Sequence, residues 1–318
     1  GPADFGFLLV NGKLADSEPQ RNMSATTPPV SPSPKPAKKS WLTRMRQRNV
    51  LPGFGLSMGI TVFSLSLLVV LPFAMMAYTT TQMGWSGFWE TISQPQVTAA
   101  IRLSLWVSFL AMLTNMVFGT LVAWVLVRYE FWGKSLINAL VDLPFALPTA
   151  VIGISLATLY APNGLIGQWF AKFDIQVAFT PIGIWLALVV VSFPFIVRAV
   201  QPVLAELSVE FEEASAVLGA NRLTTFGKVI LPELLPALFM GAGMMFARAT
   251  GEYGSVIFIA GNIPMQSEIL PIIIISKLEQ FDIQGASAVA LFMLMISFVI
   301  LLSINIVQWK LSRRVGAR

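Results

Sequence analysis

Residues 285–309 read GASAVALFMLMISFVILLSINIVQW, a run of 25 residues without a charged side chain. An α-helix rises about 1.5 Å per residue, so this run is long enough to cross the roughly 30 Å hydrocarbon core of a bilayer. Of the 318 residues, 55% are hydrophobic and 12% are charged, which is about half the charged share of a soluble domain. The stretch therefore predicts an integral membrane protein.

Five further apolar runs predict that the chain is all-α, with six membrane-spanning helices. Two other runs are too short to cross. We expect residues 83–91, which include Trp85 and Trp89, to form an interfacial helix on the outer face, and residues 269–276 to be re-entrant or interfacial there. The predicted spans are residues 54–78, 97–127, 143–160, 182–200, 235–260 and 285–309.

Lysine and arginine residues predict the orientation, because inner loops carry the excess of positive charge. Fifteen of these residues, Arg198 among them, fall before span one, after spans two and four, or after span six. The opposite side holds three, which are Arg102, Lys172 and Lys277. Both termini are therefore predicted to be cytoplasmic, as an even number of spans requires.

The ends of the chain differ from the spans in composition. Residues 1–53 are predicted to be a disordered, basic cytoplasmic extension, since residues 23–39 are rich in Pro, Ser, Thr and Lys. Met23 is typical of a natural start, so residues 1–22 would be a tag remnant. The remaining predicted parts are a six-helix domain at 54–310, with a cytoplasmic loop at 201–235, and a basic cytoplasmic tail at 311–318.

The chain contains neither cysteine nor histidine. This excludes thiol nucleophiles, Ser-His triads and nearly every zinc site, and we expect no metal site. An intramembrane hydrolase would have only Ser155 or Ser192 as its nucleophile, without a base to activate it. Residues 133–135 read Gly-Lys-Ser, but a Walker A loop needs glycine where Arg128 stands. We therefore expect no enzymatic activity and no bound cofactor.

Two charges, Arg248 and Glu252, fall inside the fifth predicted span. A charge at the bilayer centre costs about 2.5–3.5 kcal/mol on insertion scales, and a spacing of four residues allows pairing on one helix face. The pair either fixes helix packing or borders an anion path. Pro144 and Pro148 likewise allow a helix broken beside a water-filled path or a simple helix entry. Candidate path residues are Asp142, Pro148, Thr149, Ser155, Arg248, Thr250 and Glu252.

The loop between spans four and five is predicted to form a helical hairpin. Pro202 should end span four, and Ser208 should begin a helix with acids in its first turn. Gly219 should end that helix in a left-handed conformation. A second helix at residues 222–229 should be closed by Pro232. Such a hairpin either rests on the membrane or docks on a cytoplasmic partner.

Part of this loop resembles the EAA loop of ABC importer permeases. Glu213-Ala214-Ser215, Gly219 and Leu231-Pro232 match its spacing, although Ser215 replaces the second alanine and Val229 replaces the usual isoleucine. The resemblance implies that the hairpin fits a groove on a separate ATPase subunit and transmits its motion. The implied coupling residues are Glu212, Glu213, Ala214, Ser215, Gly219, Ala220, Phe226, Leu231 and Pro232.

Other segments resemble one family within these permeases, the T-type subunits of bacterial sulfate/thiosulfate importers. The resemblance runs over residues 49–314. It implies the type I (molybdate/sulfate permease-like) transmembrane fold, in the bacterial cytoplasmic membrane, with the chain forming half of an anion path. The segments that carry it are residues 128–134, 142–149, 250–254, 256–262 and 278–282.

The same resemblance implies the partners. These are a homologous W-type permease subunit, two copies of an ATP-binding subunit that holds ATP and Mg, a periplasmic sulfate- or thiosulfate-binding protein, and membrane lipid, without nucleic acid. A permease for molybdate or tungstate would share much of the pattern. A secondary transporter is the other alternative, but we find no internal repeat, and it leaves the hairpin unexplained.

The charge asymmetry generates a prediction about topology. A reporter fused after Arg318 should be active in the cytoplasm, because six spans return the chain to the side on which it begins. Parallel fusions to green fluorescent protein and alkaline phosphatase distinguish the two sides. Phosphatase activity at this position would mean that a span has been miscounted.

Overall fold

The computed structural model describes the backbone of residues 54–315 and the side chains of residues 55–310. The predicted extension at residues 1–53 and the side chains of the predicted tail lie outside this range. The chain divides into two units, Gly1–Ile60 and Thr61–Arg318. Of the first unit, the structure describes only the start of a helix, and the helical core and the candidate sites belong to the second unit.

The described elements are helices, and five helical stretches are long and apolar enough to cross a membrane. The first stretch consists of α2, a π-helical segment (Ser66–Val70) and α3. A sixth span exists if the bent pair α6 and α7 counts as one crossing. The main spanning helices are α2 (Phe54–Leu65), α3 (Leu71–Thr81), α5 (Pro95–Arg128), α9 (Pro181–Glu206), α12 (Leu231–Thr250) and α15 (Ile283–Val315).

The third predicted span is not one helix. α6 (Lys134–Ala146) and α7 (Thr149–Tyr160) meet at an angle of 110°. Leu147, between them, is extended at φ −88° and ψ 142°, because the ring of Pro148 disfavours a helical conformation in the residue before it. Of the two interpretations of these prolines, the broken helix is confirmed, and the predicted start at residue 143 is wrong.

The fourth and fifth predicted spans also end elsewhere. α9 continues through Pro202 to Glu206, so the prediction that Pro202 ends the span is wrong. A single proline removes one ladder hydrogen bond, and packing of α9 against α5 and α12 compensates for that loss. α12 ends at Thr250, ten residues before the predicted end, and a turn leads into α13 (Val256–Ile259).

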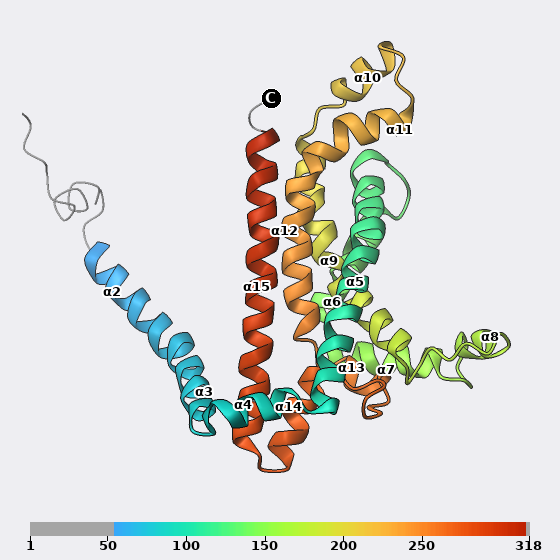
Figure 1. Ribbon diagram of the computed structural model, residues 1–318. Helices are drawn as coiled ribbons and strands as arrows, with labels where there is room; N and C mark the ends of the chain where they lie inside the picture. The colour runs from blue at the N-terminus through green and yellow to red at the C-terminus, as the bar shows by residue number, and fades with distance from the viewer. Residues whose placement is uncertain (1–53, 316–318) are drawn as a thin grey trace, which may run out of the picture. The chain divides into compact units, whose positions relative to one another are not determined.

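The core of the second unit lies where α5, α9 and α12 pack together, with α15 against α12 (Figure 1). Glycines permit the close approach of these helices. A Cβ on Gly119 of α5 would lie 2.8 Å from Ile196 of α9, and one on Gly241 of α12 would lie 2.8 Å from Ala199. Small residues at such crossings allow the backbones to pack closely in lipid.

Short helices lie at one end of the bundle (Figure 1). α4 (Gly84–Ile92) buries Phe88 and leaves Trp85 and Trp89 exposed, which agrees with the helix predicted at residues 83–91. α14 (Leu270–Glu279) covers the second short apolar run. In the turn after α14, burial opposes ionisation of Asp282, but hydrogen bonds from the Gly285 amide and Lys277 lower its pKa below the usual value. α8 (Gly167–Ala171) lies in the segment between α7 and α9.

Candidate coupling hairpin and translocation path

The candidate coupling hairpin follows α9 and precedes α12 in the chain, and it lies beyond the upper end of α12 in Figure 1. α10 (Glu210–Val217) forms its first arm and has three glutamates in its first turn, where the helix dipole favours negative charge. The Ser208 hydroxyl accepts a hydrogen bond from the Glu210 amide at 3.2 Å, so the helix starts within two residues of the predicted position. α11 (Arg222–Thr225) begins the returning arm.

Gly219 makes the turn between the arms with φ +81°, as predicted. Its amide donates to the Ala216 carbonyl at 2.9 Å, and the Ala220 amide donates to the Ser215 carbonyl at 3.0 Å. This is the Schellman pattern, which satisfies the last carbonyls of a helix. Asn221 then caps α11 by accepting from the Thr224 amide at 2.8 Å; asparagine just before a helix is a signal that the sequence analysis missed.

Arg128, the last residue of α5, ties the hairpin to the spanning helices. Its Nη2 lies 2.8 Å from Glu212 Oε1 and donates to the Leu207 carbonyl at 3.0 Å. Both side chains of the ion pair are largely buried, so solvent screens it less than a surface pair. Glu212 was predicted as a coupling residue from resemblance, whereas the role of Arg128 as its partner was not.

Two side-chain contacts hold the hairpin together and in place. The hydroxyls of Ser215 on α10 and Thr225 on α11 lie 2.7 Å apart. Phe226 packs edge-to-face against Trp124 of α5, with ring centroids 5.7 Å apart. The predicted residues Ser215 and Phe226 therefore connect the two arms of the hairpin to each other and to α5.

The tip of the hairpin is apolar and exposed. The side chains of Val217, Leu218 and Leu223 are 83–88% exposed, and Glu213 and Ala214 are exposed beside them. A groove of about 620 Å³ lies beneath, between the hairpin and the end of α5, and Ala220 is among its lining residues. Apolar residues gathered on an exposed, well-anchored turn are typical of a docking surface.

Leu231 and Pro232 do not close the second arm, contrary to the prediction. The helix runs on from Arg222 to Thr250 and contains a π-helical segment at Phe226–Ile230. The Leu231 amide donates to the Phe226 carbonyl, five residues back. The wider π turn accommodates a proline that lacks an amide proton. The returning arm and the fifth span are therefore one helix.

Arg248 and Glu252 form the predicted ion pair, with Arg248 Nη1 2.6 Å from Glu252 Oε2. Glu252 is not within the helix, however, because α12 ends at Thr250. The Glu252 side chain is only 1% exposed and its Oε1 accepts from the Ser255 amide and hydroxyl at 2.9 and 3.0 Å. Arg248 is 40% exposed, so the pair joins a fixed carboxylate to a cation on an open face.

The break between α6 and α7 lies against the turn that holds Glu252. A Cβ on Gly254 would lie 2.3 Å from the Thr149 hydroxyl, and one on Gly153 would lie 2.2 Å from the Ser255 carbonyl oxygen. The structure thus brings Thr149 next to the Arg248–Glu252 region. Of the other candidates, Pro148 and Ser155 are exposed, whereas Thr250 is buried and its hydroxyl donates to carbonyls of its own helix.

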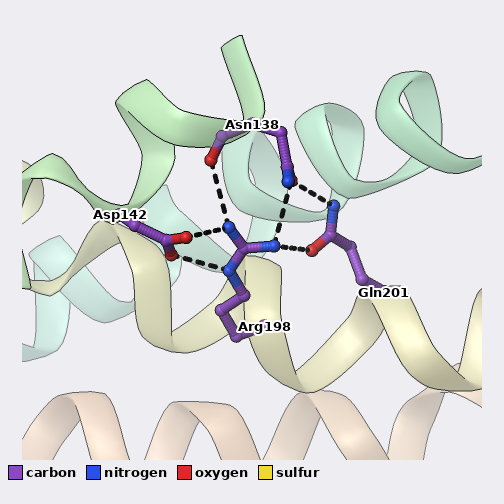
Figure 2. Close-up of polar contacts among 4 residues, drawn as sticks. All are labelled: Asn138, Asp142, Arg198 and Gln201. Carbon is purple, nitrogen blue, oxygen red and sulfur yellow. Dashed lines mark hydrogen bonds and ion pairs between the residues drawn. The ribbon is translucent and has the colours of Figure 1, made fainter. Parts of the chain in front are cut away.

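Asp142 belongs to a separate cluster. It pairs with Arg198 of α9, in a network with Asn138 and Gln201 that Figure 2 shows. Arg198 was counted with the inner loops in the orientation prediction, but it lies inside α9. Arg198, Asn138 and Gln201 were missed as site residues; an arginine within an apolar run was the signal that the sequence offered.

A family model described as a binding-protein-dependent transport system inner membrane component matches residues 115–317. The match covers more than half of the chain. The chain belongs to this family of transport permeases. The Escherichia coli (strain K12) sulfate transport system permease protein CysT is 49% identical to this permease over 84% of it and 97% of the relative. The CysT protein of Synechocystis sp. is 45% identical over 78% of the permease and 87% of the relative.

Solved structures of ABC importers share the fold of this permease. A chain in the crystal structure of a bacterial ABC transporter involved in the import of alginate aligns with a TM-score of 0.67 at 16% identity, covering 85% of the permease and 98% of that chain. A chain of the MetNI methionine ABC transporter aligns with a TM-score of 0.51 at 18% identity, covering 69% and 99%. The predicted type I importer fold is thereby confirmed.

The conformation of Gly219 generates a prediction for the hairpin. Gly219→Val should leave the permease inserted but impair transport, because a β-branched residue at φ +81° costs about 1–2 kcal/mol and would alter the turn. Gly219→Asn is the matched control, since asparagine tolerates this conformation. A Cβ at this position would meet nothing within 4 Å, so sterics do not separate the variants. Membrane insertion and ATP-driven uptake are measured together, and equal uptake by both variants would contradict the prediction.

The Arg248–Glu252 pair generates a second prediction. Arg248→Ala leaves a buried carboxylate with only the Ser255 donors, so we expect reduced assembly at a cost below the roughly 3–5 kcal/mol of a fully buried pair. Arg248→Lys, which keeps a cation beside Glu252, should retain much of the assembly, measured by detergent-resistant complex yield, whereas exchanging the two charges should not, because arginine at position 252 cannot accept from Ser255. If this face also serves the anion, Arg248→Lys should assemble but transport less. Normal assembly and normal uptake by Arg248→Ala would contradict both the structural role and the transport role of this pair.

Proposed function

We propose that this permease conducts sulfate as one half of the translocation path of an ATP-driven importer. The observation that carries the proposal is 49% identity to a sulfate transport system permease over 97% of that relative's length. Near-complete coverage means that the similarity includes the spans, the hairpin and the outer turns together. Thiosulfate, an oxyanion of the same charge, is proposed as a further cargo, whereas molybdate or tungstate remains the alternative.

We further propose that the α10–α11 hairpin docks on a cytoplasmic ATPase subunit that binds ATP and Mg. Its exposed Val217, Leu218 and Leu223 supply apolar contact area, and Glu213 supplies a charge for the partner. The Arg128–Glu212 pair supports a mechanical role, since it joins the hairpin to α5. A force applied at the tip would reach the spanning helices instead of bending a loose loop.

The proposed assembly contains a homologous W-type permease subunit, two ATPase copies and a periplasmic sulfate- or thiosulfate-binding protein, in the bacterial cytoplasmic membrane. One solved relative of the fold was crystallised in complex with an alginate pentasaccharide-bound periplasmic protein, which supports a binding-protein partner of this kind. In the proposed path, Arg248 carries its charge on an open face but is neutralised by Glu252. A neutralised cation would attract an anion weakly and release it, as transport requires.

The function is tested by sulfate uptake into proteoliposomes that contain the assembled transporter. Radiolabelled sulfate should accumulate only with ATP, loaded binding protein and both permease subunits, and vanadate should stop the accumulation. Omitting the ATPase is the control for a secondary transporter. Uptake without ATPase, or uptake by this permease without any second permease subunit, would contradict the corresponding part of the proposal. Stimulation of ATP hydrolysis by molybdate-loaded but not sulfate-loaded binding protein would favour the alternative cargo.

A further inference from the structure

Arg198 uses its whole hydrogen-bonding capacity within the permease. Its Nε donates to Asp142 Oδ1 at 2.7 Å, and its Nη2 donates to Asp142 Oδ2 and to the Asn138 carbonyl, the latter at 3.0 Å. Its Nη1 donates to the side-chain oxygens of Asn138 and Gln201 at 3.0 and 2.5 Å. A guanidinium has five N–H donors, so every one has a partner (Figure 2).

The cluster is not enclosed within the permease. The side chains of Arg198 and Asp142 are 33% and 48% exposed, so the pair lies at the surface of the unit and not in its core. Arg198 stands eight residues before the end of α9, which places it about 12 Å along the helix from the predicted cytoplasmic end. An anion leaving the path on that side would pass at this depth.

Carboxylate and sulfate engage a guanidinium in the same way. Each offers two oxygens to two parallel N–H groups, which is the geometry that arginine recognises best. Asp142 occupies the two N–H groups that sulfate would use. Because it is tethered on the adjacent helix, it competes at an effective concentration in the millimolar range or above.

Comparison with Arg248, another arginine in a spanning helix, shows that an ion pair does not require this saturation. Among the described residues, the ion pair of Arg248 is with Glu252, whose Oε2 lies 2.6 Å from its Nη1. Its partner carboxylate is fixed by Ser255 on its own turn. An ion pair takes a single carboxylate, as at Arg248, whereas occupying all five donors of Arg198 takes three partner residues.

We propose that Arg198 is a latent oxyanion-binding site and that Asp142 is the built-in anion that keeps it closed in this conformation. Asp142 and Asn138 both belong to α6, so a displacement of α6 from α9 would expose the site in one movement. While Asp142 occupies Arg198, a tetrahedral dianion such as sulfate cannot bind there and remain held beside the proposed cytoplasmic exit. The inference rests on the proposed function only in that the cargo is an oxyanion.

The test is equilibrium binding of radiolabelled sulfate to the assembled transporter without binding protein. Asp142→Asn should bind sulfate at least about tenfold more tightly than the wild type, because a hydrogen bond to a charged group contributes roughly that factor or more. The double variant Asp142→Asn with Arg198→Gln should lose this gain. Glu130→Gln is the matched control, since Glu130 is a carboxylate in an exposed pair with Lys134, and it should leave binding unchanged.

Equal binding by wild type and Asp142→Asn, or a gain that survives removal of Arg198, would overturn the proposal. If Asp142→Asn does not assemble, phenylglyoxal modification of the wild-type transporter replaces it. Arg198 should then react at least about tenfold more slowly than Arg102, an exposed arginine outside the hairpin, without protection by sulfate; comparable rates, or protection by sulfate, would overturn the proposal. A gain in Asp142→Asn alongside no sulfate uptake by the wild type would refute the cargo and leave the latent site standing.

Discussion

Charge within the membrane is the constraint on which the arrangement of this permease depends. An isolated charge at bilayer depth is costly, so a carboxylate from the chain itself stabilises an arginine inside a spanning helix. Arg198 finds Asp142 on α6, and Arg248 finds Glu252 beyond the end of α12. The first pair fixes α6 beside α9, and the second fixes the turn after α12. Two ion pairs thus position the elements that border the proposed path.

The same constraint applies to the backbone. Irregular backbone at membrane depth is tolerated only where protein or a water-filled cavity covers it. The break before α7 and the turn after α12 meet this requirement by covering each other, since Gly153 packs against the Ser255 carbonyl and Gly254 against Thr149. A Cβ at either glycine would push the two irregular segments apart. The break before α7 and the turn after α12 therefore depend on each other for cover, and both lie beside Arg248 and Glu252.

What the sequence predicted well is local. An uninterrupted apolar run predicts a span, and Gly219 ends a helix through its own conformational freedom, so the second and sixth spans and the hairpin turn agree with the structure. Hydropathy does not report where the backbone hydrogen bonds of a helix are interrupted, so the predicted bounds of the third and fifth spans were wrong. Proline was overestimated as a terminator, because packing carries α9 through Pro202 and a π turn admits Pro232. The Arg198–Asp142 contact joins residues 56 positions apart, and no local pattern encodes it.

The continuity of the fifth span links the two candidate sites. One helical stretch runs from Arg222 in the hairpin to Thr250, over 29 residues, which is about 43 Å at the rise of an α-helix. Its first residues come directly after the exposed hairpin tip, and its last turn carries Arg248 beside the buried Glu252. The π segment at Phe226–Ile230 is where such a helix bends most readily, and there Phe226 packs against Trp124 of α5. A displacement of the tip would therefore bend this helix at the π segment, with α5 as its support, and reach the ion pair through the continuous helical stretch beyond it. Had Pro232 ended the helix, the hairpin and the ion pair would have been joined only by a flexible turn.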